Sequence, residues 1–268
     1  YHASQFHNAN RSLVFDNLFY NGASTAGGNA LTGQLGQMPG NQFHQLNAAG
    51  GYTISKETRL SGSLSLGRMT QNEAFLPYIT TSGILPATPV SSLNGRIDTT
   101  HADIKLSSKL THDLNITAGY RYDDRDNKTP VNTYIYNPAD NTNAAGYANS
   151  ASQSTTRRNT PLSKTQQVAN VDMDYHLSAA TRLRLGYDYD RVTHTYEPTD
   201  GDVEHTLKAE VKHSFSDAAS GGLSYSHSDR NASDYNGAAP LYSTYTATYL
   251  ASLCVAPNTF LYNGVVTN

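Results

Sequence analysis

Residues 101–123 read HADIKLSSKLTHDLNITAGYRYD, and this stretch contains two runs of alternating side chains. In residues 102–110 nearly every second side chain is apolar, and charged or polar side chains stand between them. The same alternation continues through residues 114–122. A period of two places successive side chains on opposite faces of a strand, so the stretch predicts two strands joined by the turn 111–113.

The alternation recurs along most of the chain, whereas a helical period is hard to find. Further strands are expected at 45–54, 59–66, 169–177, 182–190 and 206–215, with a weaker one at 223–226 and flanking candidates near 11–20 and 241–251. The sequence therefore predicts an all-β chain of about ten strands.

The connections between these strands alternate in length. Short turns are expected near 55–57, 111–113, 178–180 and 216–219, and long polar loops near 21–41, 71–96, 126–163, 194–202 and 228–240. This rhythm is typical of an outer-membrane barrel with short periplasmic turns and long outer loops. We therefore expect an antiparallel transmembrane β-barrel in the bacterial outer membrane, with residues 1–268 forming a portion of a single barrel domain.

The placement of charge favours lipid on one side of the strands and a lumen on the other. The central apolar positions carry no Lys, Arg, Asp or Glu, and a Lys or Arg facing lipid at mid-depth would cost roughly 2–4 kcal/mol. The alternate positions carry both signs of charge, which disfavours a pore selective for one sign. The residues expected to face the lumen and a partner within it are Arg59, His101, Asp103, Lys105, Arg121, Asp123, Arg125, Asp172, Asp174, His176, Arg184, Asp188, Asp190, Lys208, Glu210 and Lys212.

The composition excludes several other classes of protein. A net charge of −3 over 268 residues argues against a nucleic-acid binder, and a single Cys excludes a disulfide framework or a CxxCH haem attachment. The ten His residues form no HxxxH or HExxH motif, and no Ser/His/Asp grouping stands out. We therefore expect no catalytic residue, no metal site and no cofactor in this chain.

Two segments carry a more specific signal than alternation does. Residues 58–78 read TRLSGSLSLGRMTQNEAFLPY and residues 119–130 read GYRYDDRDNKTP. Both resemble the MtrB/PioB family of decahaem-associated outer-membrane β-barrel proteins, and the strand rhythm from about 42 to 215 fits the same family. The resemblance implies a sheath around a periplasmic multihaem (decahaem) c-type cytochrome, which carries electrons across the outer membrane. The haems would belong to that partner, and an outer-surface multihaem cytochrome is a further candidate partner.

The chain departs from this family in strand number. Family barrels contain many more strands than the ten expected here, and a ten-stranded barrel would be too narrow to admit a multihaem protein. Open strand edges inside lipid are also forbidden, because their backbone groups would lack partners. The chain begins at Tyr1 and lacks the CxxC pair that some members carry. We therefore expect a fragment of a larger barrel.

Three other functions remain open. A passive diffusion porin would conduct ions without a cytochrome. An outer-membrane protease or lipase would lose hydrolase activity when a rim His or Asp is changed. A soluble β-sandwich would stay in solution without detergent.

Overall fold

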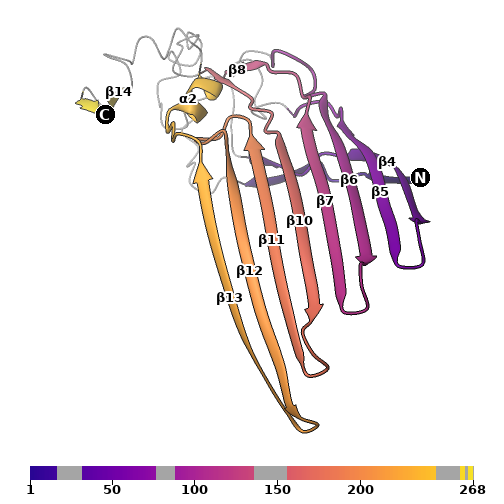
Figure 1. The fold of residues 1–268 in the computed structure, drawn as a ribbon. Coiled ribbons are helices and arrows are strands. Elements are labelled where there is room, and N and C mark those ends of the chain that lie inside the picture. Colours follow the sequence, from indigo (N-terminus) through magenta and orange to yellow (C-terminus); the bar gives the residue numbers. More distant parts are fainter. Residues whose placement is uncertain (17–31, 77–87, 136–155, 246–259, 263–264, 268) are drawn as a thin grey trace, which may run out of the picture.

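The computed structural model describes residues 1–16, 32–76, 88–135, 156–245, 260–262 and 265–267. Within them, nine strands form one antiparallel sheet in the order β1-β4-β5-β6-β7-β10-β11-β12-β13 (Figure 1). Each long strand pairs with the next long strand along the chain, so the sheet is a meander. Its strands are β1 (His2–Phe6), β4 (Asn41–Thr53), β5 (Thr58–Gln71), β6 (Gly95–Lys109), β7 (Leu114–Asn127), β10 (Lys164–His176), β11 (Thr181–His194), β12 (Gly201–Ser216) and β13 (Ala219–Ala232).

The two ends of the sheet carry different connections, as the alternation of short and long loops predicts. Figure 1 shows the tight turns gathered at one end and the longer connections at the other. We call these the short-turn end and the long-loop end. The short turns are 54–57, 110–113, 177–180 and 217–218, and the long-loop end carries 72–94, 128–163 and 195–200.

The long strands have 13 to 16 residues, which is more than the ten or so that the hydrophobic pattern predicts. The ladder continues past the last apolar residue because backbone hydrogen bonding does not require apolar side chains. In β7, for example, the strand extends to Asn127, five residues past Tyr122. The tyrosines of β7 therefore mark the upper limit of the apolar positions and not the end of the strand.

Small elements lie outside the main sheet. β2 (Ser12–Asp16) pairs with β3 (Thr32–Gly36), β8 (Thr133–Ile135) with β9 (Thr156–Arg158), and β14 (Phe260–Tyr262) with β15 (Val265–Thr267). The strand predicted near 11–20 is thus confirmed as β2, but it does not join the nine-stranded sheet, and residues 17–20 lie outside the described part.

The strand predicted at 241–251 is wrong over its described residues, because α2 is a helix from Ala239 to Thr244. Pro240 in its first turn supplies the φ angle of a helix and lacks the N–H that this turn would leave unpaired. Residues 246–251 lie outside the described part. Among the described residues, no helix is long and apolar enough to span a bilayer.

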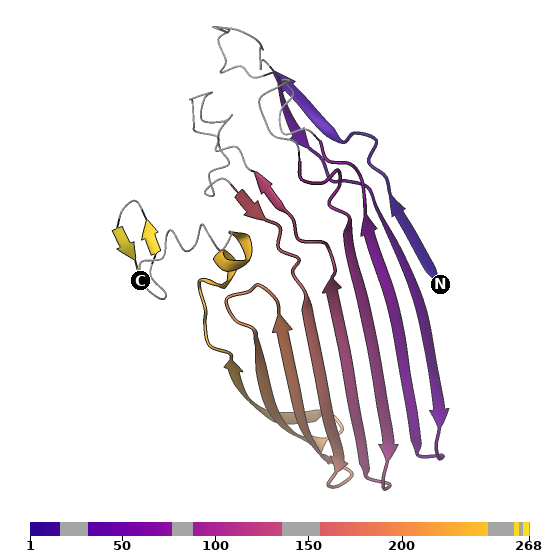
Figure 2. The same cartoon turned by 90° about the horizontal axis from the view of Figure 1, so that it is seen from above.

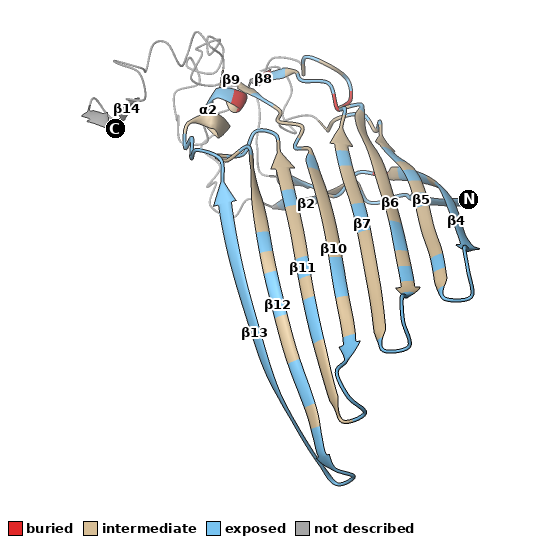
Figure 3. Cartoon of the chain, viewed as in Figure 1, coloured by how far each residue is buried: buried red, intermediate tan, exposed pale blue. Residues whose placement is uncertain are grey.

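The sheet is a single layer with almost no buried core. Figure 2, which turns the view of Figure 1, shows the long strands side by side and the sheet bending towards β12 and β13. Figure 3 shows that nearly all of its surface is exposed or half-buried. Among the described residues, Tyr134 is the one buried hydrophobic side chain, at 9% exposure. A sandwich requires a second sheet packed on the first, and the described residues form none, so the soluble sandwich does not fit.

Candidate functional site: the polar face of the sheet

The strand register sorts the side chains into rows that cross the sheet. Arg59 pairs with Ser107, Ser107 with Thr117 and Thr117 with Asp172, and the row continues through Gly186 and Lys208. Directly paired residues point to the same side of a sheet. By this register, all sixteen residues predicted to face a lumen share one side of the sheet, which we call the polar face.

The opposite side, which we call the apolar face, exposes large hydrophobic side chains. One of its rows contains Leu60, Leu106, Ala118, Val171 and Tyr187. The exposed fractions on this face reach 58% at Leu207, 67% at Tyr225 and 79% at Leu223. An exposed apolar surface of this extent is a surface for contact with lipid or protein.

Charged residues enter the apolar face only towards the long-loop ends of the strands. Arg68 Nε lies 2.7 Å from Asp98 Oδ1, and Lys128 Nζ lies 3.2 Å from both Asp98 and Asp126. Lys128, which follows β7, donates hydrogen bonds to Asp126 and Asp98, and these bonds raise its pKa, the bond to Asp126 contributing most. This rim of ion pairs bounds the apolar positions where a membrane headgroup region would begin.

Ion pairs cross-link the polar face over β10, β11 and β12. Asp174 accepts hydrogen bonds from Arg182 and lies 3.4 Å from Arg184 Nε. Arg184 Nη1 in turn lies 3.2 Å from Glu210, whose other oxygen lies 2.9 Å from Lys212 Nζ. Lys208 pairs with Asp188. All but the Glu210–Lys212 pair, which lies within β12, join neighbouring strands, so charges of opposite sign neutralise each other within the sheet.

A second network lies over β5, β6 and β7. Arg121 Nε lies 2.9 Å from Asp123, and Asp123 Oδ1 lies 2.5 Å from His101 Nδ1. The other ring nitrogen of His101 lies 3.6 Å from Asp103, which also accepts a hydrogen bond from a serine of β5. Arg125, the next charged residue of this face on β7, does not join the network and donates a hydrogen bond to the Leu162 carbonyl at 3.2 Å.

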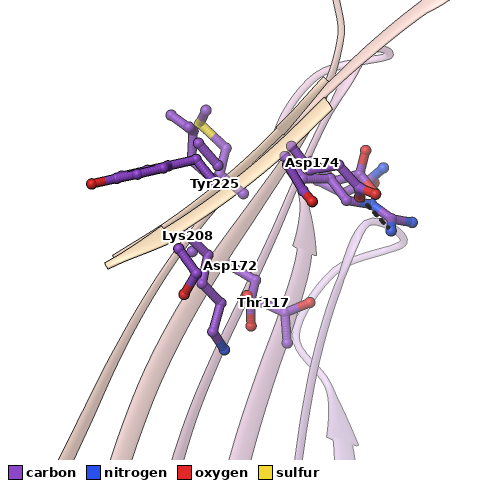
Figure 4. A pocket seen from close by; sticks show the side chains of 14 residues that line it. Thr117, Asp172, Asp174, Lys208 and Tyr225 are labelled. Carbon is purple, nitrogen blue, oxygen red and sulfur yellow. Dashed lines mark hydrogen bonds and ion pairs between the residues drawn. The ribbon is translucent and has the colours of Figure 1, made fainter. Parts of the chain in front are cut away.

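The polar face is hollowed over β7 and β10–β13. A hollow of about 690 Å³ is lined there mostly by polar-face residues such as Asn115, Thr117, Asp172 and Lys208, together with residues of the alternate positions such as Tyr225. Figure 4 shows Thr117, Asp172 and Lys208 on the opposite side of a strand from Tyr225. The hollow therefore follows the polar face but has apolar residues in its lining.

Several charged residues of the polar face fall outside the strands predicted from the sequence. Lys164, Asp202, Glu204 and Arg230 follow the same alternation but lie beyond the predicted strand limits. Extending each predicted strand in phase would have found them. Among the described residues, no group of three or more His, Cys, Asp or Glu side chains could hold a metal ion.

Comparisons with known proteins place this sheet in a family. Residues 1–256 match a family model described as "Putative outer membrane beta-barrel porin, MtrB/PioB". The chain is 29% identical over 237 residues to the outer membrane protein MtrB of Shewanella baltica (strain OS185), covering 88% of this chain and 31% of that protein. The chain thus spans about a third of the length of this relative.

A solved structure shows a weaker likeness. The alignment with OmpT, an outer membrane protein of Vibrio cholerae, covers 85% of this chain and 53% of the OmpT chain. The sequence identity is 12% and the TM-score is 0.38. The assignment depends instead on the family match over nearly the whole chain, together with the long antiparallel strands and the two contrasting faces. The chain belongs to the MtrB/PioB family of outer-membrane β-barrel proteins.

Proposed function

We propose that this chain forms part of a barrel sheath that embeds and insulates a periplasmic multihaem (decahaem) c-type cytochrome. Such a complex conducts electrons across the outer membrane. The haems belong to the cytochrome, and this chain contributes no cofactor and no catalytic residue. An outer-surface multihaem cytochrome is a further partner of the same conduit.

The contrast between the two faces of one sheet carries this proposal. The apolar face exposes side chains such as Leu207 and Leu223, which suit contact with lipid. The polar face carries cross-strand ion pairs such as Arg184–Glu210, which suit contact with water or a polar protein. A sheet with these faces separates a polar interior from the bilayer.

The chain's contribution to electron transfer is positional. The polar face holds the cytochrome by hydrogen bonds and charge, and the apolar face keeps lipid outside. The protein thereby fixes where the haem chain begins and ends, while electrons pass through the partner. The cytochrome partner is inferred from the resemblance of residues 58–78 and 119–130 to the family. It therefore needs a direct test.

The test is extraction of the protein from its own outer membrane in mild detergent, followed by a haem-stained gel and a redox spectrum. We expect a c-type cytochrome to co-purify and to resist added protease until the barrel is unfolded. The control is an outer membrane from cells that lack this protein, in which the same haem band should be absent. An intact barrel that carries no haem protein would overturn the proposal.

A passive diffusion porin is the second candidate. The family's description as a porin favours it. This candidate predicts steady ion conductance in planar bilayers from protein that never contained a cytochrome. A protein purified with haem, and conducting only after the haem protein is removed, would favour the sheath instead.

A further inference from the structure

Most cations of the polar face are neutralised within the sheet, which makes the exceptions informative. Six of its eleven Lys and Arg side chains form ion pairs with carboxylates of the same face: Arg121, Arg182, Arg184, Lys208, Lys212 and Arg230. Among the described residues, the other five form none. Two of these five, Arg125 and Lys164, pair in register towards the long-loop end.

The remaining three, Arg59, Lys105 and Lys109, lie together at the short-turn end, and we call them the basic patch. Lys105 and Lys109 lie two residues to either side of Ser107 on β6, and Arg59 of β5 is the direct partner of Ser107. Diagonal neighbours on one face of an antiparallel pair lie about 7–8 Å apart. The three residues therefore occupy positions around a single neutral serine.

The Arg59 side chain extends from β5 over its other neighbour, β4. A Cβ built on Gly51 would lie 3.6 Å from an Arg59 terminal nitrogen and 3.7 Å from its Nε. The guanidinium thus lies over this position of β4, at ordinary contact distance. All three cations of the basic patch are exposed, so their charges are available to a partner.

The surroundings of the basic patch do not neutralise it. The paired residues on β7 are the neutral Asn115, Thr117 and Gly119. The carboxylate of Asp103 accepts a hydrogen bond from the Ser63 hydroxyl and lies 3.6 Å from His101 Nε2. The carboxylate of Glu57 accepts a hydrogen bond from the Ser55 hydroxyl. Neither carboxylate forms an ion pair with the basic patch in the part of the chain that the structure describes.

The imbalance extends over this half of the sheet. The polar face of β4–β7 carries five cations and two carboxylates, whereas that of β10–β13 carries six cations and seven carboxylates. The mixed charge predicted from the sequence is therefore unevenly distributed. The positive excess is concentrated at the end that the barrel topology assigns to the periplasm.

We infer that the basic patch docks a carboxylate-rich surface of the protein held inside the barrel. Three like charges on one face repel one another, and no carboxylate of the described residues pairs with them. An anionic partner, through Asp and Glu side chains or haem propionates, would remove that repulsion and be guided to the periplasmic end. The inference depends on the proposed function, because it names where the cytochrome is held.

The test compares two triple variants with equal loss of charge. The patch variant is Arg59→Gln, Lys105→Gln, Lys109→Gln, and the matched control is Lys208→Gln, Lys212→Gln, Arg230→Gln, which removes cations that already have partners. Each protein is purified as a complex from native outer membranes and washed with rising NaCl while retained haem is measured. We expect the patch variant to bind the cytochrome about tenfold more weakly, and to release it at lower salt than the control.

A charge-conserving variant, Arg59→Lys, Lys105→Arg, Lys109→Arg, should restore retention. Equal retention in the patch variant and the control would overturn the inference while leaving the sheath proposal standing. Absence of haem from the unmodified protein would instead overturn the sheath proposal. If the patch variant does not fold, the salt wash of the unmodified complex tests the inference instead. Retention of haem that does not change with NaCl concentration would then overturn it.

Discussion

At the residue scale, the orientation of a single side chain decides the cost of a charge. Ile104 points to the apolar face from the middle of β6, and it is 48% exposed. Because Lys facing lipid at mid-depth is strongly disfavoured, we expect Ile104→Lys to lower the free energy of unfolding in lipid vesicles by about 2–4 kcal/mol. Urea titration of the reconstituted barrel, followed on a gel that separates folded from unfolded protein, measures this loss.

The matched control is Asn170→Lys, which places the same charge on the polar face opposite Asp188 and two residues from Asp172. An exposed ion pair changes stability by at most about 1 kcal/mol, so this variant should unfold close to the unmodified protein. Equal losses in the two variants would show that the faces are not divided between lipid and lumen as their residues indicate.

At the element scale, the connections at the two ends of the sheet predict the topology of the barrel. His112 lies in the turn between β6 and β7, and Glu197 lies in the connection between β11 and β12 at the other end. In a background with Cys254→Ser, we expect a membrane-impermeant maleimide to label Glu197→Cys on intact cells. His112→Cys should be labelled only after the outer membrane is permeabilised. The reverse pattern would invert the orientation and move the basic patch to the outer side.

The sequence alone predicts most of the strands of the sheet, because alternation is a property of each strand by itself. The strands around 102–110 and 114–122 were found this way, and both faces follow from them. Strand limits could not be found, because pairing continues through polar residues such as Asp124 and Asp126. The helix at Ala239–Thr244 was missed because six residues are too few to show a helical period.

The polar face is predictable from alternation within the predicted strand limits, but its partition into paired and unpaired charges is not. Ion pairs such as Arg184–Glu210 depend on register between strands, and the sequence does not state the register. The same limit hides the basic patch, since Arg59 and Lys105 are far apart in the chain and meet only through the pairing of β5 with β6.

At the scale of the whole molecule, the edges of the sheet bear on the width of the barrel. In the described part of the chain, β1 and β13 are the outer strands and do not pair with each other. An unpaired edge in lipid leaves backbone groups without partners, at a cost of several kcal/mol each. A barrel of about eight strands is filled by its own side chains, whereas 16–18 strands leave an aqueous channel. This chain spans about a third of the family relative, so that relative is long enough to form a barrel with an aqueous channel.

We therefore expect the protein from its native outer membrane, once stripped of any partner, to form a wide aqueous pore. Vesicles containing it should swell in solutions of a disaccharide, since a lumen that can hold a folded cytochrome also admits small sugars. Vesicles that contain the intact complex serve as the control and should swell more slowly, because the partner fills the lumen. If the stripped protein is folded yet admits no sugar, the nine strands would have to close into a narrow barrel, and β1 and β13 would have to meet.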